Sequence, residues 1–433
     1  MEAGNGFQRG GGSFGPHATV PAQRVESLAM DFQLPDPVIP DHVPADLVRP
    51  FPYMFGTTTA ADPFNEWAPA VHQGPPIFYA PHAYPGATPA WIVRRVEDLR
   101  QVYMDTDTFS SKDFSPYSKM IGDTWTNLPV EIDPPHHGKY RAFINPLFTP
   151  SAMAKLEGRI RSYAIEYIEG FRESGSCEFM ADFAFEFPIK VFLELMDFPL
   201  SNTAQFLEWE TGLLHEMDMA KMAQATRNVV GFLREQITER RRNPRDDIIS
   251  YALGVEIEGR KLTEDELVGF AFNLFIGGLD TVSTNMGLQF LHLARNPEHQ
   301  TYLKENPQHI QHAIDEMMRA YAAVTTFRTC TRETELGGVR MMPGDKVAMS
   351  TTLAGRDPEA FPDPGAVRFD RNPRHVSFGF GPHMCVGMHL ARREMRIAIE
   401  EFVQRIPQFG VAPGHRIEYH LGMIQPVTLP LVW

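Results

Sequence analysis

The residues with the most evident chemistry surround Cys385, near the C-terminal end of the chain. They form the run Ser377-Phe-Gly-Phe-Gly-Pro-His-Met-Cys-Val-Gly387. Glycines at positions 379, 381 and 387 let the backbone turn tightly and approach a large, flat group. A helix is predicted directly after the cysteine, and its free N–H groups and dipole favour the thiolate over the thiol. The pattern therefore predicts a thiolate that acts as a nucleophile or a metal ligand, rather than a buried structural cysteine.

A second unusual run, Gly277-Gly278-Leu279-Asp280-Thr281, lies midway along the longest predicted helix. Each glycine inside a helix costs roughly 1 kcal/mol relative to alanine, so an ordinary core helix has little reason to carry two. A helix that presses against a flat ring has such a reason, and so has a helix that crosses another one closely. Both interpretations are open from these residues alone.

The elements that carry these two runs are mostly helical. Thr263 and Glu266 form a capping box, and the helical pattern continues from there to residue 296. At 1.5 Å per residue, this helix is on the order of 45 Å long. Many helices with a small, separate sheet predict an α+β fold that is predominantly α. Further helical patterns cover 151–175, 206–242, 308–323 and 387–406, and β-rich runs cover 77–79, 91–93 and 339–350.

The composition limits the classes of protein to be considered. With 433 residues, 43% of them hydrophobic and 22% charged, the chain has an ordinary globular balance. A net charge of -14 disfavours nucleic acid and anionic membranes, so we expect neither as a partner. The longest apolar stretch, 267–279, is shorter than the roughly 20 residues that span a membrane. Three cysteines are too few for a disulfide framework, and a cytoplasmic location is expected.

The chain is expected to have two parts. Residues 1–45 form an arm rich in glycine and proline, and residues 46–433 form a single domain without a linker pattern. No internal repeat is present in the sequence, and we expect a monomer.

The run at 378–387 resembles the haem-binding loop of soluble bacterial cytochrome P-450 enzymes, which are haem-thiolate monooxygenases. The pattern Phe-Gly-x-Gly-x-His-x-Cys-x-Gly fixes six positions within ten. The likeness extends over about 91–433, and the runs at 277–282, 388–394 and 429–433 are similar to the camphor-hydroxylase branch. The resemblance implies the cytochrome P-450 fold, with a long central helix over the haem, and haem b (iron protoporphyrin IX) as cofactor. It also implies that Cys385 ligates the iron and that electron donation by the thiolate promotes O–O cleavage.

The resemblance assigns roles to residues outside the cysteine loop as well. Asp280 and Thr281 correspond to the acid–alcohol pair that helps deliver protons during dioxygen activation, with Lys190 as a candidate partner of Asp280. Haem propionates are carboxylates that need cationic or polar ligands. The residues at the family's offsets for this role are His137, Arg141, Arg328 and His383.

A Glu-Arg-Arg cluster that supports the cysteine loop is a further implied feature. The spacing Glu-x-x-Arg places both side chains on one helix face. The distance to the cysteine loop selects Glu316 and Arg319, and Arg371 completes the cluster, which we expect to be structural. The same spacing also occurs at Glu97/Arg100, Glu169/Arg172 and Glu239/Arg242.

In the substrate pocket the chain departs from the camphor enzyme. Trp125 stands where that enzyme has a tyrosine that hydrogen-bonds the ketone of camphor. The indole N–H is also a donor, and one hydrogen bond contributes only about 0.5–1.5 kcal/mol, so the exchange disfavours camphor but keeps a carbonyl substrate open. We expect a small apolar terpenoid or norisoprenoid ketone. The pocket residues assigned by offset are Trp125, Asn127, Val130, Asn273, Ile276, Gly277, Val324, Thr326, Met423 and Ile424.

Electrons must come from another protein, because the sequence has neither a suitable cysteine set nor a Gly-x-Gly-x-x-Gly motif that opens a βαβ unit. The implied partner is a [2Fe–2S] ferredoxin reduced by an NAD(P)H-dependent flavoprotein reductase. Two alternatives stay open: a peroxide-driven haem-thiolate peroxygenase, and a haem-thiolate gas sensor or carrier without turnover. The predicted docking face for the ferredoxin carries Lys139, Arg141, Arg374, Arg392 and Arg393.

Overall fold

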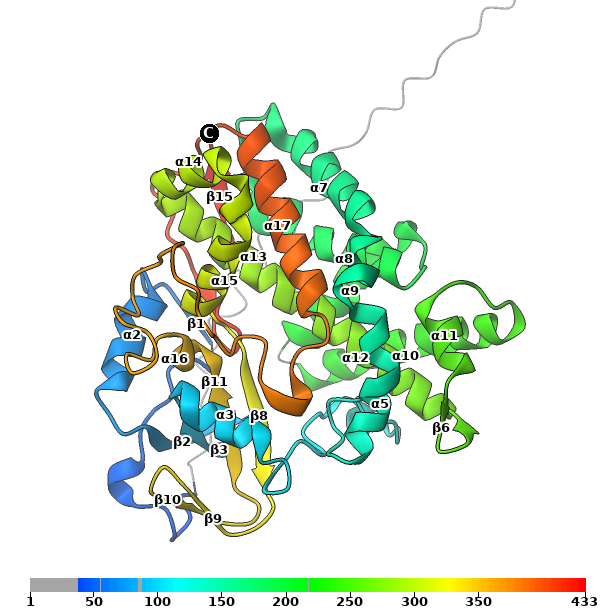
Figure 1. Cartoon of the computed structure of the whole chain (residues 1–433), viewed down its shortest axis with the longest axis vertical. Helices are drawn as coiled ribbons and strands as arrows, with labels where there is room; N and C mark the ends of the chain where they lie inside the picture. The colour runs from blue at the N-terminus through cyan, green and yellow to red at the C-terminus, as the bar shows by residue number, and fades with distance from the viewer. Residues whose placement is uncertain (1–37, 55, 85–87, 217) are drawn as a thin grey trace, which may run out of the picture. The chain divides into compact units, whose positions relative to one another are not determined.

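The computed structural model describes residues 38–54, 56–84, 88–216 and 218–433, which all belong to one unit of the fold. Most of the predicted arm, 1–45, therefore lies outside the described residues. Figure 1 shows many helices beside a small sheet, with strands β2, β3, β8 and β11 away from the central helices. The prediction of an α+β fold that is predominantly α is confirmed.

The main sheet joins chain segments that lie far apart in the sequence. The parallel pair of β3 and β11 places Val347 beside Trp91, and the other neighbouring strands are antiparallel. Both of these side chains belong to a buried hydrophobic cluster on one side of the sheet. The sheet thereby fixes the position of the predicted site residues on β8. Its strand order is β2 (Ile77–Tyr84), β3 (Thr88–Val93), β11 (Lys346–Ser350), β8 (Thr325–Cys330) and β4 (Phe109–Ser110).

The helices and minor strands complete the described fold. The helices that position the candidate site are α3 (Val96–Met104), α4 (Tyr117–Ile121), α5 (His136–Ile144), α8 (Glu186–Leu195), α9 (Thr203–Leu214), α10 (Met219–Arg242), α12 (Glu264–Gly278), α13 (Asp280–Arg295), α15 (Ile310–Ala320) and α17 (Met388–Arg405). The other helices are α2 (Pro63–His72), α6 (Pro150–Ala154), α7 (Glu157–Arg172), α11 (Ile248–Gly254), α14 (Pro297–Glu305) and α16 (Thr351–Gly355). The minor strands are β1 (Thr57–Thr58), β5 (Ser176–Glu178), β6 (Glu256–Ile257), β7 (Arg260–Lys261), β9 (Thr334–Leu336), β10 (Val339–Met341), β12 (Gly410–Val411), β13 (Tyr419–His420), β14 (Gln425–Pro426) and β15 (Pro430–Val432).

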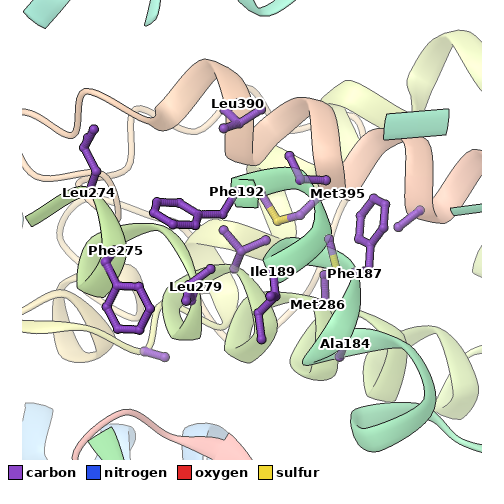
Figure 2. Close-up of a cluster of buried hydrophobic side chains, with 14 of the residues drawn as sticks. Ala184, Phe187, Ile189, Phe192, Leu274, Phe275, Leu279, Met286, Leu390 and Met395 are labelled. Atoms are coloured by element: carbon purple, nitrogen blue, oxygen red, sulfur yellow. The ribbon is translucent and has the colours of Figure 1, made fainter. Parts of the chain in front are cut away.

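The main hydrophobic core holds α12 and α13 in place relative to α17. Phe192 of α8 packs against Phe275 of α12, with ring centroids 6.0 Å apart. Since α17 directly follows the cysteine loop, this core fixes the distance between that loop and the central helix. Figure 2 shows the buried side chains of these four helices, among them Phe187, Ile189, Phe192, Leu274, Phe275, Met286, Leu390 and Met395.

The predicted long helix 264–296 is interrupted at Leu279, where α12 ends and α13 begins. Its capping box is confirmed, because Thr263 and Glu266 each accept the backbone N–H of the other. At the interruption, Thr281 Oγ1 donates to the carbonyl oxygen of Gly277 at 2.9 Å, so a side chain satisfies a helix carbonyl. By length and composition this segment could cross a membrane, but most of it is buried within the fold, as in a core helix.

Two other predicted helix boundaries are wrong. The pattern predicted at 151–175 begins one residue earlier, because Thr149 caps α6 by accepting the N–H of Ala152 at 3.2 Å. The pattern at 206–242 forms two helices instead of one, because Asp218 caps α10 by accepting the N–H of Ala220 at 2.8 Å. In both places a side-chain oxygen that accepts the first free N–H groups decides where the helix begins.

Candidate active site

Cys385 lies in a turn that the neighbouring glycines shape. Gly379 and Gly381 have φ angles of 71° and 69°, in the left-handed region that favours glycine. A Cβ atom at position 381 would lie 3.2 Å from the carbonyl oxygen of Tyr103 and 2.8 Å from Met104 Sδ, so the turn also packs closely on the end of α3. The backbone N–H of Cys385 donates to the carbonyl oxygen of Phe378 at 2.8 Å. These contacts hold the thiol where the turn meets α17.

The sulfur of Cys385 faces both hydrogen-bond donors and positive charge. Burial raises the pKa of its thiol, while the N–H groups of Gly387 and Met388 and the charges of Arg141 and Arg392 act in the opposite direction. The side chain nevertheless keeps accessible surface. A thiol that is deep enough for burial to raise its pKa, and yet accessible, borders an internal space. A metal ion bound there would deprotonate the thiol outright.

The other two cysteines are unsuited to hold a metal. Cys177 and Cys330 are both buried, and burial raises the pKa of each thiol. Cys330 also donates its S–H to the carbonyl oxygen of Arg332 at 2.9 Å. Of the three cysteines, Cys385 is therefore the one whose surroundings suit a thiolate ligand.

The four residues predicted to bind propionates contribute two neighbouring imidazole rings and two guanidinium groups. The rings of His137 and His383 lie with their centroids 4.0 Å apart. Arg141 Nη1 donates to the carbonyl oxygen of Met384 at 2.9 Å, beside the cysteine. Arg328 is 5% exposed, and its Nη1 donates to a backbone carbonyl oxygen.

This cluster of four side chains carries more positive than negative charge. Burial, Arg141 and Arg328 lower the pKa of His137 to about 4. Burial, Arg328, His137 and Arg141 lower the pKa of His383 to about 2. Within the described residues, neither arginine hydrogen-bonds a carboxylate through its side chain. The one acidic group near this cluster in the described part of the chain is Asp133, which accepts hydrogen bonds from Ser110 and Ser111. Two cations and two neutral imidazoles therefore keep an excess of positive charge that fits the carboxylates of haem propionates, so the donor set suits the implied cofactor.

One face of α12 borders open space, as the sulfur of Cys385 does. Gly277 is exposed, and Asn273, Ile276 and Thr281 are half-buried, whereas most of the helix is buried. The first three positions share one face of α12 by their spacing. Thr281, in the first turn of α13, is tied to the same face by its hydrogen bond to the carbonyl oxygen of Gly277. A Cβ atom at position 277 would meet no atom within 4 Å. A close helix crossing therefore does not explain this glycine, and the interpretation that the helix faces a flat group is favoured.

Asp280 is buried and held by two side chains that sequence analysis missed. Gln425 Nε2 donates to Asp280 Oδ1 at 2.7 Å, and His215 Nε2 lies 3.1 Å from the same oxygen. Burial lowers the pKa of His215, but the carboxylates of Asp280 and Glu210 outweigh it and raise the pKa to about 10. The imidazole is therefore a cation at neutral pH. No spacing rule connects residues 215, 280 and 425, so the sequence offers no signal for this contact.

The prediction that Lys190 pairs with Asp280 is wrong. Lys190 Nζ binds Glu166 at 3.0 Å and lies 4.3 Å from the centroid of the Tyr167 ring. Both of these partners lie on α7, which packs against α8. The lysine is therefore directed toward α7, and His215 occupies the place that was assigned to it.

The structure brings the predicted Glu-Arg-Arg cluster together. Glu316 and Arg319 are fully buried and form a bidentate pair, with both N–O distances 2.8 Å. Arg371 Nε lies 3.1 Å from Glu316 Oε1. The competing pair Glu169/Arg172 is exposed to 42% and 40%, so burial distinguishes pairs that the sequence spacing cannot.

This cluster is linked to the cysteine loop through α15. Ser377 Oγ, at the start of the loop, donates to the carbonyl oxygen of Met318 at 2.8 Å. Arg319, the next residue, donates to three carbonyl oxygens of the segment 355–366. The cluster can therefore hold the loop in place without facing the space in front of Cys385.

The predicted pocket residues come from four segments: 125–130, α12, the start of β8 and the residues before β14. Trp125 is 2% exposed, and Asn127 and Ile424 are fully buried, so these three pack within the protein. Asn127 Nδ2 donates to Ser115 Oγ at 3.1 Å. The remaining seven keep accessible surface: Val130, Asn273, Ile276, Gly277, Val324, Thr326 and Met423.

Trp125 is not available as the hydrogen-bond donor that we expected. Its Nε1 donates to Asp123 Oδ2 at 3.1 Å, and Arg234 Nη2 donates to the same oxygen at 3.0 Å. The indole ring packs on Phe272 of α12, with ring centroids 4.6 Å apart. The N–H group is therefore used within the protein, and a ligand near Trp125 meets carbon.

Comparisons with known proteins agree with this geometry. A family model described as Cytochrome P450 matches residues 188–414. The probable cytochrome P450 127A1 of Sinorhizobium fredii is 37% identical over 402 residues, which cover 91% of this chain and 97% of that protein. The crystal structures of CYP101J2 and CYP101C1 match with TM-scores of 0.82 and 0.81 at 29% and 32% identity. Each match covers 92% of this chain, and 99% and 100% of those chains respectively.

Proposed function

Because this chain belongs to the cytochrome P450 family of haem-thiolate monooxygenases, we propose that it hydroxylates a small apolar terpenoid or norisoprenoid ketone. It shares the fold of bacterial members and, with the family, haem b as cofactor. The observation that carries the haem-dependent hydroxylation is the accessible sulfur of Cys385 beside a cluster with an excess of positive charge.

Cys385 would hold the haem iron through its sulfur. His137, Arg141, Arg328 and His383 would hold the two propionates. When bound, the haem supplies dioxygen activation, which places one oxygen atom in the substrate and releases the other as water. The backbone N–H groups that donate to the sulfur adjust its electron donation, as hydrogen bonds to metal ligands generally do.

Asp280 and Thr281 supply protons in this proposal. Thr281 lies in the first turn of α13 and keeps accessible surface, and its Oγ1 donates the hydroxyl proton to the carbonyl oxygen of Gly277 at the end of α12. Asp280 is the neighbouring acid, and its Oδ1 is oriented by Gln425 and His215. The carboxylate can accept a proton from the His215 imidazolium and pass it to the hydroxyl oxygen after Thr281 has donated its own, which makes the alcohol ready to donate again.

Thr281→Ala tests this assignment. We expect NAD(P)H consumption to continue, while product formed per NAD(P)H falls at least about tenfold, because alanine lacks the hydroxyl proton that the proposed relay donates. The measurement compares NAD(P)H consumed, product and hydrogen peroxide. Ser283→Ala is the matched control, because Ser283 Oγ also donates to the carbonyl oxygen four residues earlier, at 3.1 Å. Equal uncoupling in both variants would mean that the helix geometry, and not the hydroxyl proton, is responsible.

The ferredoxin proposal now rests on fewer cations than predicted. Lys139, Arg392 and Arg393 form ion pairs with Glu258, Asp315 and Glu157 in turn. Arg374 is exposed, and no carboxylate binds its side chain or that of Arg141 in the part of the chain that the structure describes. These two arginines support a docking site for an acidic [2Fe–2S] ferredoxin, reduced by an NAD(P)H-dependent flavoprotein.

The experiment that tests the proposed function has two stages. Titration with camphor and with an ionone-type ketone should shift the Soret band from low to high spin, fully for the ionone and weakly for camphor. Reconstitution with a ferredoxin and its reductase should then couple NAD(P)H consumption to hydroxylated product, at a rate that falls as salt screens the docking charges. A full shift with camphor and none with the ionone would exclude the substrate class.

The acid–alcohol pair of Asp280 and Thr281 also distinguishes a monooxygenase from a peroxygenase and from a gas sensor or carrier. A peroxide-driven peroxygenase has no need of a proton relay, and a gas sensor or carrier needs neither the relay nor an electron donor. The presence of buried Asp280 beside half-buried Thr281 at the start of α13 supports the oxygenase. We place the enzyme in the cytoplasm, as a monomer that meets its ferredoxin there.

A further inference from the structure

Glu210, His215 and Asp280 bring three possible metal ligands together, and sequence analysis did not consider the first two. His215 Nε2 lies 3.1 Å from Asp280 Oδ1 and 3.4 Å from Glu210 Oε1. One ligand atom from each of the three side chains lies within 4.8 Å of the other two. An imidazole nitrogen and two carboxylate oxygens are therefore close enough to share one ion.

Two chain segments position these groups. Glu210 lies on α9, and His215 directly follows the last residue of this helix, with its backbone N–H still donating to the carbonyl oxygen of Thr211 at 3.0 Å. Asp280 is the first residue of α13. The side chains of Glu210 and Asp280 are each 3% exposed, whereas that of His215 is 15% exposed. The carboxylates are thus fixed in the interior, and the imidazole keeps the accessible surface through which an ion can enter.

The spacing of the three ligand atoms fits a tetrahedral metal ion. With Zn–N and Zn–O bonds of about 2.0–2.2 Å, neighbouring ligand atoms of a tetrahedral zinc site lie roughly 3.3 Å apart. The two distances from His215 Nε2, 3.1 and 3.4 Å, are close to this value. The oxygens of Glu210 and Asp280 are no more than 4.8 Å apart, so they would approach each other by at most about 1.5 Å. Water can supply the fourth ligand at the accessible side of His215.

The charges of this cluster also favour a divalent cation. Two carboxylates face a single imidazole, so one negative charge is in excess even when the imidazole is protonated. No lysine or arginine of the described residues forms an ion pair with Asp280. A divalent ion that binds both carboxylates and the neutral imidazole leaves no net charge, and buried charges are stable only when they are balanced. Any proton on His215 Nε2 leaves to solvent when the ion binds.

Gln425 supports the Asp280 carboxylate from outside the cluster. Its Nε2 donates to Asp280 Oδ1 at 2.7 Å and to Thr284 Oγ1 at 2.8 Å. Metal ligands usually have such outer partners, which fix their orientation. The ligand types select the metal as well, because Mg²⁺ and Ca²⁺ prefer shells made of oxygen atoms, whereas imidazole combined with carboxylate suits Zn²⁺.

We propose that Glu210, His215 and Asp280 form a Zn²⁺ site, and that the bound ion stops Asp280 from passing protons to Thr281. The binding follows from the geometry of the three side chains. The inhibition rests, in addition, on the proposed function, in which Asp280 supplies protons for dioxygen activation. Zinc thereby regulates turnover without binding to Cys385.

Zinc binding is measured on the holoenzyme, in which the haem iron occupies Cys385. Competition with a chromophoric chelator should reveal a single tightly bound zinc ion per chain, which excess Mg²⁺ does not displace. X-ray absorption at the zinc edge should show nitrogen and oxygen ligands, an imidazole among them, and no sulfur. A sulfur ligand, or a protein that takes no zinc from the chelator, would overturn the site.

Two ligand variants and a control variant assign the site. Glu210→Gln and His215→Gln each remove one ligand and should weaken zinc binding at least about tenfold, since even the loss of an outer partner costs roughly 10–100-fold. His299→Ala should leave the affinity unchanged, although His299 Nδ1 lies 2.8 Å from His292 Nε2 in another close pair of imidazoles. The spectrum of the carbon monoxide complex shows that each variant has folded around haem. Wild-type affinity in both ligand variants, or a loss confined to His299→Ala, would overturn the assignment.

The effect on turnover is measured with ferredoxin, reductase and NAD(P)H. Saturating Zn²⁺ should lower the rate of product formation at least about tenfold, the smaller end of what a lost proton donor costs, and a chelator should restore the rate. Reduction of an external electron acceptor by ferredoxin and reductase alone controls for zinc that acts on the partners. Zinc that binds with the expected ligands but leaves product formation unchanged overturns the inhibition and contradicts the proposed role of Asp280.

The two sets of measurements separate this inference from the proposed function. A protein that forms no product in the absence of zinc contradicts the proposed function and, with it, the inhibition, whereas chelator competition and X-ray absorption still decide whether the site exists. Inhibition by zinc that is as strong in Glu210→Gln as in the wild type would show that zinc acts elsewhere. That result overturns the inference and leaves the hydroxylation supported.

Discussion

Cys385→Ser is expected to abolish the long-wavelength Soret band of the reduced protein under carbon monoxide, together with dioxygen-dependent turnover. The serine hydroxyl is a far weaker donor than a thiolate, although the N–H groups of Gly387 and Met388 would still point at it. Loss of a supporting contact to a metal ligand costs roughly 10–100-fold, and loss of the ligand itself should exceed this. The spectrum of the carbon monoxide complex and product formation measure the effect.

A second cysteine provides the control for this variant. Cys330 is buried in the main sheet, and a serine there could donate to the same carbonyl oxygen of Arg332. Cys330→Ser should therefore keep both the Soret band and the turnover. Retention of the thiolate spectrum in Cys385→Ser would refute the assignment of the ligand, and loss of the spectrum in both variants would point to a general effect of removing sulfur.

The parts of the site that sequence analysis predicted depend either on local spacing or on the family resemblance, which assigned the distant partners Arg371 and His137. The cysteine loop could be predicted because its glycines, its cysteine and the start of α17 lie within a dozen residues. The capping box of Thr263 and Glu266 is equally local, and it is present. The predominantly helical fold follows from helical periodicity over many segments, which is the strongest signal in a single sequence.

The parts that were missed depend on contacts between distant segments. His215 and Gln425 meet Asp280 across 65 and 145 positions, and packing decides which side chains reach it. The interruption at Leu279 has no periodic signal, because apolar spacing continues on both sides of it. Trp125 shows the same limit, since its identity suggested a donor whereas its contact with Asp123 removes that donor.

Arg319→Ala is expected to lower the free energy of unfolding by about 3–5 kcal/mol, the usual cost of removing one partner of a buried ion pair. The change leaves Glu316 buried with Arg371 as its remaining arginine. It also removes the donor from three backbone carbonyl oxygens in the segment 355–366. Denaturant or thermal unfolding measures the loss. Since Ser377 Oγ is bonded to Met318, the haem content of the purified variant should fall as well.

Arg172→Ala is the matched control, because Arg172 forms the same Glu-x-x-Arg pair with Glu169 on an exposed helix face. Exposed ion pairs are screened by water and salt, so the free energy of unfolding of this variant should be almost that of the wild type. Glu316→Gln separates charge from shape, since glutamine keeps the size of the side chain but leaves Arg319 and Arg371 without a counter-charge. If Glu316→Gln were as stable as the wild type, the cluster would act through its hydrogen bonds to the backbone, and the ion pair would be dispensable. If the free energy of unfolding fell as much in Arg172→Ala as in Arg319→Ala, burial would not be what distinguishes the two ion pairs.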